Sequence, residues 1–315
     1  MRSVEAIVPL KLTLFGEHAV VYGYPAIAMA ISETMKVRVE KSDKTIVSSN
    51  TLTIGNIKVD LDEMRAESSQ LNRVLSYVIA ALNYFQDRRP VHVSVESTVE
   101  PSVGLGTSAA VIVGVVASYS RYIGLNYSPE EIAKISREIE RSVQGLGSRM
   151  DTYTTSLGGL LYFPRNSDDV MRINGNLQIA AGYIRRATST AEILRRVKRL
   201  RDRGHIVDKI MDVIGEVTEL ARKALESGDD SLLGELMYVN HGLLSSLGVS
   251  HPTIDELVST ARSLGMKGCK MSGGGGGGSV ICVREPKSEI LLESKGLKIV
   301  NSEINSTGVT TKEIN

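Results

Sequence analysis

The segment Pro101-Ser-Val-Gly-Leu-Gly-Thr-Ser-Ala-Ala110 decides how the chain is interpreted. It follows an alternating apolar stretch, residues 91–96, that predicts a strand. It precedes residues 108–123, whose mostly apolar sequence predicts a buried helix. Glycine lets backbone N–H groups approach a ligand closely, and a helix N-terminus attracts anions. The segment therefore predicts a phosphate site, although such a turn is also common without a ligand.

A second glycine run occupies residues 273–278. Glycine-rich segments often act as flexible linkers, and that alternative stays open here. The flanking residues 269–272 and 280–283 are apolar enough to form strands, however, whereas a linker would have polar flanks. Six residues without Cβ suit a loop that lies flat against another backbone or a ligand, so we favour a functional loop.

Chain length and hydrophobic periodicity indicate an α/β protein of two domains. A chain of 315 residues is long for a single core, so we expect a ligand site where two domains meet. Alternation and apolar runs predict strands, and steps of three and four predict helices. The expected strands cover residues 4–8, 10–15, 35–40 and 91–96, and within residues 270–283 one strand precedes the glycine run and another follows it. The expected helices cover residues 70–85, 108–123, 129–142, 190–203, 206–227, 230–244 and 253–264. A polar run at residues 165–169 predicts the domain boundary, which divides the chain into residues 1–168 and 169–315.

Composition and charge argue against several kinds of partner and location. The net charge of +1 gives no reason to expect nucleic acid or a membrane surface as a partner, and no stretch approaches the ~20 apolar residues of a membrane span. Glu5 lies where a signal peptide would have its apolar core. Cys269 and Cys282 lack metal-ligand spacing, so we expect two small buried side chains in a reduced, cytoplasmic protein. The sequence leaves open whether the chain forms a homodimer.

Five polar residues could supply chemistry. Lys11 lies in an otherwise apolar strand and needs a partner unless it faces solvent, and Glu17 and His18 follow in the same segment. Glu140 and Asp151 lie eleven residues apart across a turn. Phosphoryl transfer needs a phosphate cradle, Mg²⁺, a positive group and a base. The sequence offers each part once, although each residue taken alone is more often structural or a solvated charge.

Read together, three motifs resemble the GHMP kinase family. They are PLKLTLFGEHAVVYG at residues 9–23, PSVGLGTSAA at 101–110 and KMSGGGGGG at 270–278. The motifs occur in the family's order and extend over nearly the whole chain. The resemblance implies a two-domain α/β (α+β) fold, in which an N-terminal mixed sheet with helices precedes a ferredoxin-like C-terminal domain.

Within the family, GEHAVVYGYPA at residues 16–26 is most similar to the members that phosphorylate mevalonate. The resemblance therefore implies ATP-dependent phosphorylation of (R)-mevalonate to 5-phosphomevalonate, a step of isoprenoid biosynthesis. The short length and sparse insertions resemble archaeal or bacterial members rather than animal ones.

The family's catalytic roles carry over to matching positions of this sequence. Asp151 would act as the base or orient the 5-hydroxyl, and Lys11 would lower the pKa of that hydroxyl and stabilise the transferring phosphoryl group. Ser108 and Glu140 would hold Mg²⁺ against the ATP phosphates.

The resemblance also implies the residues that contact the two substrates. Glu17, His18 and Ser148 would line the acceptor pocket together with Lys11 and Asp151. The expected contacts of ATP are Pro101, Ser102, Val103, Gly104, Leu105, Gly106, Thr107, Ser108, Ala109, Ala110, Ser272, Gly273, Gly274 and Gly275.

One stretch departs from the family pattern and keeps alternatives open. Residues 144–151 read QGLGSRMD, with Gly147 and Arg149 where the family usually has proline and glycine. An acceptor with its own phosphate needs an extra cation, and Arg149 is a candidate. A phosphomevalonate kinase or related decarboxylase, another small-molecule kinase of the family, and a non-catalytic sensor with this fold are the alternatives.

Overall fold

The computed structural model of the protein describes residues 3–49, 54–58, 72–145, 148–175, 177–188 and 190–314. The first elements are β1 (Ser3–Phe15), the 3₁₀ helix η1 (Ala19–Tyr22), β2 (Ala26–Lys41), β3 (Ile46–Ser49), β4 (Ile54–Lys58), α1 (Asn72–Tyr84), β5 (Val91–Ser97), α2 (Thr107–Tyr122), α3 (Pro129–Gln144), α4 (Met150–Leu157), β6 (Leu160–Phe163) and β7 (Met171–Arg172). They are followed by β8 (Ile179–Ile184), α5 (Thr190–Arg201), α6 (Ile206–Ser227), α7 (Asp230–Ser246), α8 (Pro252–Ser263), β9 (Cys269–Ser272), β10 (Gly278–Val283), α9 (Ser288–Ser294), β11 (Lys298–Val300) and β12 (Thr310–Ile314).

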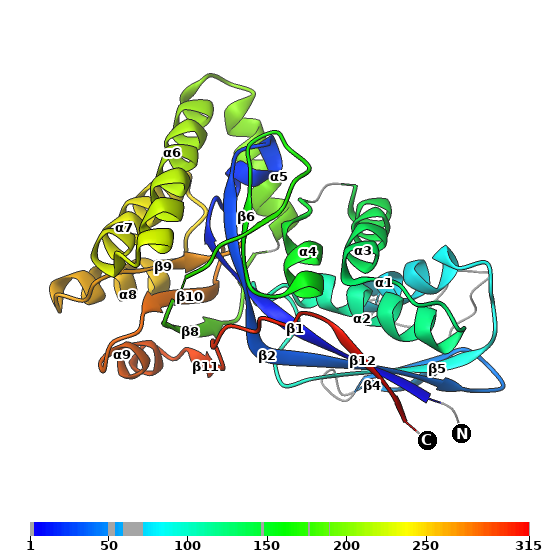
Figure 1. Ribbon diagram of the computed structural model, residues 1–315. Helices are drawn as coiled ribbons and strands as arrows, with labels where there is room; N and C mark the ends of the chain where they lie inside the picture. The colour runs from blue at the N-terminus through cyan, green and yellow to red at the C-terminus, as the bar shows by residue number, and fades with distance from the viewer. Residues whose placement is uncertain are drawn as a thin grey trace.

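A mixed sheet underlies the N-terminal half. Its strand order is β12-β1-β2-β5-β3-β4, and β6 and β7 extend it from β2. Among the described strands, β3 and β5 pair in parallel and the other pairs are antiparallel. Helices α1 to α4 lie over one face of this sheet (Figure 1). Helix α2 is buried along nearly its whole length, as its apolar sequence predicts, because it packs on β1 and β2 and beneath α1 and α3.

The second sheet has the ferredoxin-like order. Its strands run β11-β8-β10-β9 and pair antiparallel. Helices α5 to α8 connect β8 to β9, and α9 connects β10 to β11, which gives the β-α-β-β-α-β pattern with additional helices. The predicted mixed N-terminal sheet and ferredoxin-like C-terminal domain are therefore confirmed.

The chain crosses between the two halves more than once. Strand β7 pairs with β6 in the first sheet, and β12 returns from the second half to pair with β1. The N- and C-terminal ends consequently lie side by side (Figure 1). The division into residues 1–168 and 169–315 thus remains a prediction, with 310–314 lying in the first sheet. Along the described ranges, no helix has the length and apolar character that a membrane span requires.

The two cysteines correct one expectation. Cys269 and Cys282 face each other directly across the β9–β10 pair, with their Cα atoms 4.0 Å apart, and form a disulfide. The prediction of two unlinked thiols was wrong because the pairing register of a hairpin brings these residues together, and sequence spacing does not reveal register. The bond closes the hairpin that presents the second glycine run.

Polar contacts between β1 and β9 join the two halves at the end of β1. The Thr13 backbone N–H donates to Ser272 Oγ at 2.9 Å, and the same hydroxyl donates to Thr13 O at 2.9 Å. Four residues beyond Thr13, Glu17 forms a salt bridge with Lys270, and both side chains are almost fully buried. Asn240 of α7 donates to the second oxygen of Glu17 at 2.9 Å. Burying a charged pair is tolerable only when its hydrogen-bonding groups are satisfied, and these contacts meet that need.

We predict that Lys270→Met lowers the free energy of unfolding by about 3–5 kcal/mol, because it leaves Glu17 buried without its cation. The double variant Glu17→Gln/Lys270→Met removes both charges and should recover most of that loss. Chemical denaturation of the three proteins measures the difference. An equal loss in the single and double variants would show that the salt bridge does not govern the stability of this contact.

Candidate active site

A cavity of about 1170 Å³ lies between the two halves of the molecule. The N-terminal half contributes residues of β1, η1, α1, the turn before α2, α3 and α4, and the C-terminal half contributes the segment after β8, α5 and the second glycine run. The lining residues are Lys11, Val21, Tyr22, Ser76, Tyr77, Ser102, Gly104, Gly106, Thr107, Ser108, Glu140, Val143, Gln144, Asp151, Arg186, Ala187, Thr188, Leu194, Arg195, Lys198, Gly273 and Gly274. A site between the halves agrees with the expectation from chain length.

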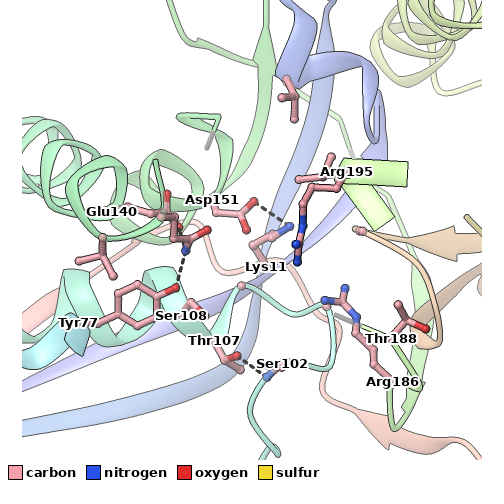
Figure 2. Close-up of a pocket in the computed structure, with 18 of the residues that line it drawn as sticks. Lys11, Tyr77, Ser102, Thr107, Ser108, Glu140, Asp151, Arg186, Thr188 and Arg195 are labelled. Atoms are coloured by element: carbon pink, nitrogen blue, oxygen red, sulfur yellow. Dashed lines mark hydrogen bonds and ion pairs between the residues drawn. The ribbon is translucent and has the colours of Figure 1, made fainter. Parts of the chain in front are cut away.

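The turn before α2 forms one wall of the cavity. Gly104 and Gly106 adopt φ values of 94° and 73°, a region that favours glycine. The Ser102 N–H donates to Thr107 Oγ1 at 3.1 Å, which fixes the turn (Figure 2). A Cβ on Gly106 would lie 2.8 Å from Lys11 Cγ, so glycine lets the turn approach β1. No side chain caps α2, and its first N–H groups can bind an anion at the cavity.

The predicted ATP contacts divide into two sets. Ser102, Gly104, Gly106, Thr107, Ser108, Gly273 and Gly274 line the cavity. The lining does not include Pro101, Val103, Leu105, Ala109, Ala110, Ser272 and Gly275. Of the second set, Val103, Leu105, Ala109 and Ala110 are buried in the core, whereas Pro101 is exposed. Ser272 instead bonds to Thr13, as described above.

The second glycine run lies flat against backbone. The Gly276 N–H donates to Val249 O at 2.9 Å. A Cβ on Gly275 would lie 1.9 Å from the same carbonyl oxygen, so only glycine fits there. This close packing leaves Gly273 and Gly274 at the cavity wall, next to the turn before α2, where a Cβ on Gly273 would lie 3.2 Å from Gly104 O. The structure thus favours the functional loop over the flexible linker.

Lys11 and Asp151 form the chemical centre of the cavity. Lys11 Nζ lies 2.9 Å from an Asp151 carboxylate oxygen and donates to Thr13 Oγ1 at 2.9 Å. Its side chain is 3% exposed and that of Asp151 is 33% exposed, so the carboxylate can reach a ligand. Figure 2 shows the two side chains directed toward each other from β1 and α4. The lysine thus has the partner that its place in an apolar strand requires.

Glu140 lies on the same wall as Ser108. Burial raises the pKa of Glu140 to about 8, and the nearby Asp151 charge adds to this shift. Gln144 donates toward Glu140 at 3.5 Å and to the Tyr77 hydroxyl at 2.5 Å. Carboxylate and hydroxyl oxygens are the ligands that Mg²⁺ prefers. Among the residues the structure describes, no group of three or more His, Cys, Asp and Glu side chains could hold a metal, so phosphate oxygens would have to complete its coordination.

Three residues expected at the acceptor pocket lie outside the cavity lining. Glu17 is held in its buried pair with Lys270, and the Ser148 hydroxyl accepts from the Met150 N–H at 3.3 Å, at the start of α4. His18 is 5% exposed, and its Nε2 lies 3.2 Å from Gly274 O. Burial lowers the pKa of His18 to about 4, so the ring is neutral at pH 7. Glu17 and His18 therefore support the cavity wall from behind.

Cationic residues of the C-terminal half were missed by sequence reasoning. Arg186 follows β8 and lies beside the turn before α2, where a Cβ on Gly104 would come within 3.0 Å of its guanidinium. Burial lowers the pKa of Arg186 to about 10, which leaves it charged at pH 7. Arg195 and Lys198 of α5 also line the cavity. The basic composition of 185–203 was the available signal, but it did not reveal which side chains face inward.

Arg149 is directed away from the cavity lining. Its guanidinium lies 3.3 Å from an Asp168 oxygen, donates to Asp169 O at 2.8 Å, and stacks over the Phe163 ring at 5.7 Å. The side chain is thereby engaged outside the cavity, so it is poorly placed to bind a phosphate on the acceptor. Gly147, the other departure from the family pattern, lies outside the described residues.

Comparison with known proteins places these features in a family. The model of the GHMP kinases N terminal domain matches residues 76–159, and that of the GHMP kinases C terminal matches residues 221–293. The chain is 55% identical to a mevalonate kinase of Saccharolobus solfataricus over 97% of this chain and 98% of that protein. It is 36% identical to a mevalonate kinase of Pyrococcus horikoshii over 88% of each chain.

Solved structures agree with the sequence comparison. The crystal structure of the Methanococcus jannaschii mevalonate kinase superposes with a TM-score of 0.80 at 28% identity, covering 96% of this chain and 98% of that one. The structure of L. major mevalonate kinase in complex with R-mevalonate has the same fold, with a TM-score of 0.78 at 22% identity over 96% of each chain. With both halves, both glycine-rich motifs and nearly its entire length accounted for, the chain belongs to the GHMP kinase family.

Proposed function

We propose that the protein transfers the γ-phosphoryl group of ATP to the 5-hydroxyl of (R)-mevalonate. The observation that carries the proposal is the Lys11–Asp151 pair, 2.9 Å apart, in a cavity whose wall includes the N-terminus of α2. That arrangement suits phosphoryl transfer to an alcohol. The acceptor is assigned because a relative that is 55% identical over nearly the whole chain is named a mevalonate kinase.

The reaction divides among residues of this chain. The α2 N-terminus and Arg186 bind the anionic phosphates, and Lys11 compensates negative charge on the transferring group. Asp151 orients the 5-hydroxyl and accepts its proton. The hydroxyl oxygen forms a bond to the γ-phosphorus while the bond from that phosphorus to the bridging oxygen of ADP breaks. The products are 5-phosphomevalonate and ADP.

The oxygen donors of Ser108 and Glu140 suit Mg²⁺ as the metal of this site. We assign Ser108 and Glu140 as its protein ligands, because both line the cavity and supply hard oxygen atoms. When bound, the ion would neutralise phosphate charge. Cytoplasmic location is part of the proposal, since ATP is supplied there. The disulfide is compatible with this location, since intracellular disulfides are known, above all in hyperthermophiles.

The alternatives are less well supported by the geometry. A kinase or decarboxylase that binds a phosphorylated acceptor would need a cation for that phosphate, and the candidate Arg149 is engaged with Asp168 and Asp169. A non-catalytic sensor would not need the paired Lys11 and Asp151. Both side chains are present and in contact.

We predict that ADP release is fastest with mevalonate when mevalonate, phosphomevalonate, homoserine and galactose are compared at equal concentration. A coupled assay of ADP formation measures all four rates. Equal or higher kcat/KM with any of the other three acceptors would overturn the assignment of mevalonate. Binding of ATP and mevalonate without ADP release would instead support the sensor.

We predict that Asp151→Asn lowers kcat by at least about 10²-fold, the low end for acid–base groups, because the amide cannot accept the hydroxyl proton. The KM for ATP should change little. Asp43→Asn, which alters an exposed carboxylate outside the cavity, is the matched control and should retain full activity. A near-normal kcat in Asp151→Asn would exclude this residue as the base.

We predict that binding of Mg²⁺·ADP at pH 7 releases a proton from Glu140. The pKa of about 8 means that the free protein holds this group largely protonated at pH 7, whereas a metal ligand must be ionised. Apparent affinity should therefore rise with pH up to about 8 and then level off. Calorimetry in two buffers of different ionisation enthalpy counts the proton. Glu140→Gln should abolish the release, and a wild-type protein that releases none would remove Glu140 from the metal site.

A further inference from the structure

The Lys11 side chain is held along its whole length. Its backbone N–H donates to Leu105 O at 3.0 Å, and its stem packs so closely on the turn before α2 that a Cβ on Gly106 would lie 2.8 Å from Lys11 Cγ. At the other end, Nζ lies 2.9 Å from an Asp151 oxygen and donates to Thr13 Oγ1 at 2.9 Å. These oxygens engage two of the three N–H groups of the ammonium, and the third can be directed to a phosphoryl oxygen in the cavity that Lys11 lines.

Thr13 lies behind the cavity lining and is fully buried. Residues two apart in a strand point to the same face of the sheet, which brings its hydroxyl beside the Lys11 ammonium. Its backbone N–H and carbonyl both bond to the Ser272 hydroxyl, and the Ser279 hydroxyl donates to Ser272 O at 3.1 Å. Branching at Cβ also restricts the rotamers of threonine. The hydroxyl that meets Lys11 is therefore fixed by contacts from the C-terminal half.

The two oxygen partners of Lys11 differ in what happens to them during phosphoryl transfer. Asp151 begins as a carboxylate and takes up the proton of the acceptor hydroxyl, so its attraction for the ammonium falls as the reaction proceeds. The Thr13 hydroxyl is neutral throughout and keeps its bond to Nζ. A lysine side chain is flexible, so an ammonium held by Asp151 alone would be free to move at the moment when the transferring group needs it.

We propose that Thr13 is a positioning residue, whose hydroxyl holds the Lys11 ammonium at the transferring phosphoryl group while Asp151 takes up the proton. This inference rests on the proposed function and adds to it a residue that acts through Lys11 rather than by touching a substrate. The support matters most in the transition state, when the hold of Asp151 is weakened. Loss of the hydroxyl should therefore lower kcat and leave the KM values of both substrates nearly unchanged.

The test compares Thr13→Val with Thr13→Ser by steady-state kinetics of ADP release with ATP and mevalonate. Valine keeps the branched shape and removes the hydroxyl, so kcat should fall by about 10- to 100-fold, the usual range for a hydrogen bond to a charged group. The KM for ATP and for mevalonate should change by roughly threefold at most. Serine keeps the hydroxyl and should retain most of the wild-type kcat. A merely structural role predicts the opposite order, because serine removes a packed methyl group and valine does not.

Thr218→Val is the matched control, because it removes a fully buried threonine hydroxyl that donates to Ile214 O at 2.7 Å within α6, outside the cavity lining. It should match the wild-type kcat. If Thr13→Val does not fold, Thr13→Ala takes its place and should show the same fall relative to Thr13→Ser. An unchanged kcat without the hydroxyl, a loss that appears in KM, or a serine variant as slow as valine overturns the positioning role while the proposed function stands. A wild-type enzyme that releases no ADP with mevalonate refutes the proposed function, and this inference with it.

Discussion

The docking of the end of β1 onto β9 is the contact on which the rest of the site depends. The Ser272 hydroxyl accepts a hydrogen bond from the Thr13 backbone N–H and donates one to the Thr13 carbonyl oxygen. The buried salt bridge of Glu17 and Lys270 follows directly after the end of β1. These contacts join residues more than 250 positions apart in the sequence. They fix Lys11, which is on the same strand, relative to the second glycine run. A phosphoryl group can be placed between the two halves only if this junction is rigid, since its transfer depends on positioning.

The charges of the cavity are arranged for two anionic substrates. Two carboxylates, Glu140 and Asp151, lie on the N-terminal side, and the C-terminal half contributes its cations from the segment after β8 and from α5. Burial disfavours the charged form of both Glu140 and Arg186. An anionic nucleotide with its metal relieves both penalties, because it offers Arg186 a counter-charge and Glu140 a cation. Ligand binding and the unfavourable electrostatics of the free cavity are thus coupled.

Much of the fold could be predicted from local signals. Residues 206–227 were expected as a helix and form α6 with the same bounds. The helix expected over 129–142 forms as α3, which begins with a capping box of Ser128 and Glu131. Two of the strands that were missed, β8 and the first part of β2, are buried on both faces. Their sequences are continuous apolar runs, which lack the alternation that marks a half-buried strand. The pairing register of the strands could not be predicted from the sequence either, and the disulfide between Cys269 and Cys282 depends on that register.

At the site, the sequence predicted which residues lie near the cavity better than it predicted the role of each side chain. The four residues that the family motifs singled out, Lys11, Ser108, Glu140 and Asp151, all line a single cavity, although Lys11 lies within β1 and Glu140 within α3. Local periodicity alone would not have brought them together. Glu17 is only six residues from Lys11, yet its side chain lies behind the wall, since its orientation is set by Lys270 in the other half. Proximity in sequence therefore predicts that a residue is near a site, whereas its role depends on which distant partner satisfies its charge. A buried carboxylate needs its ammonium and amide partners to remain charged, so these contacts tie Glu17 to the junction of the two halves. Its contact with the acceptor stays a prediction.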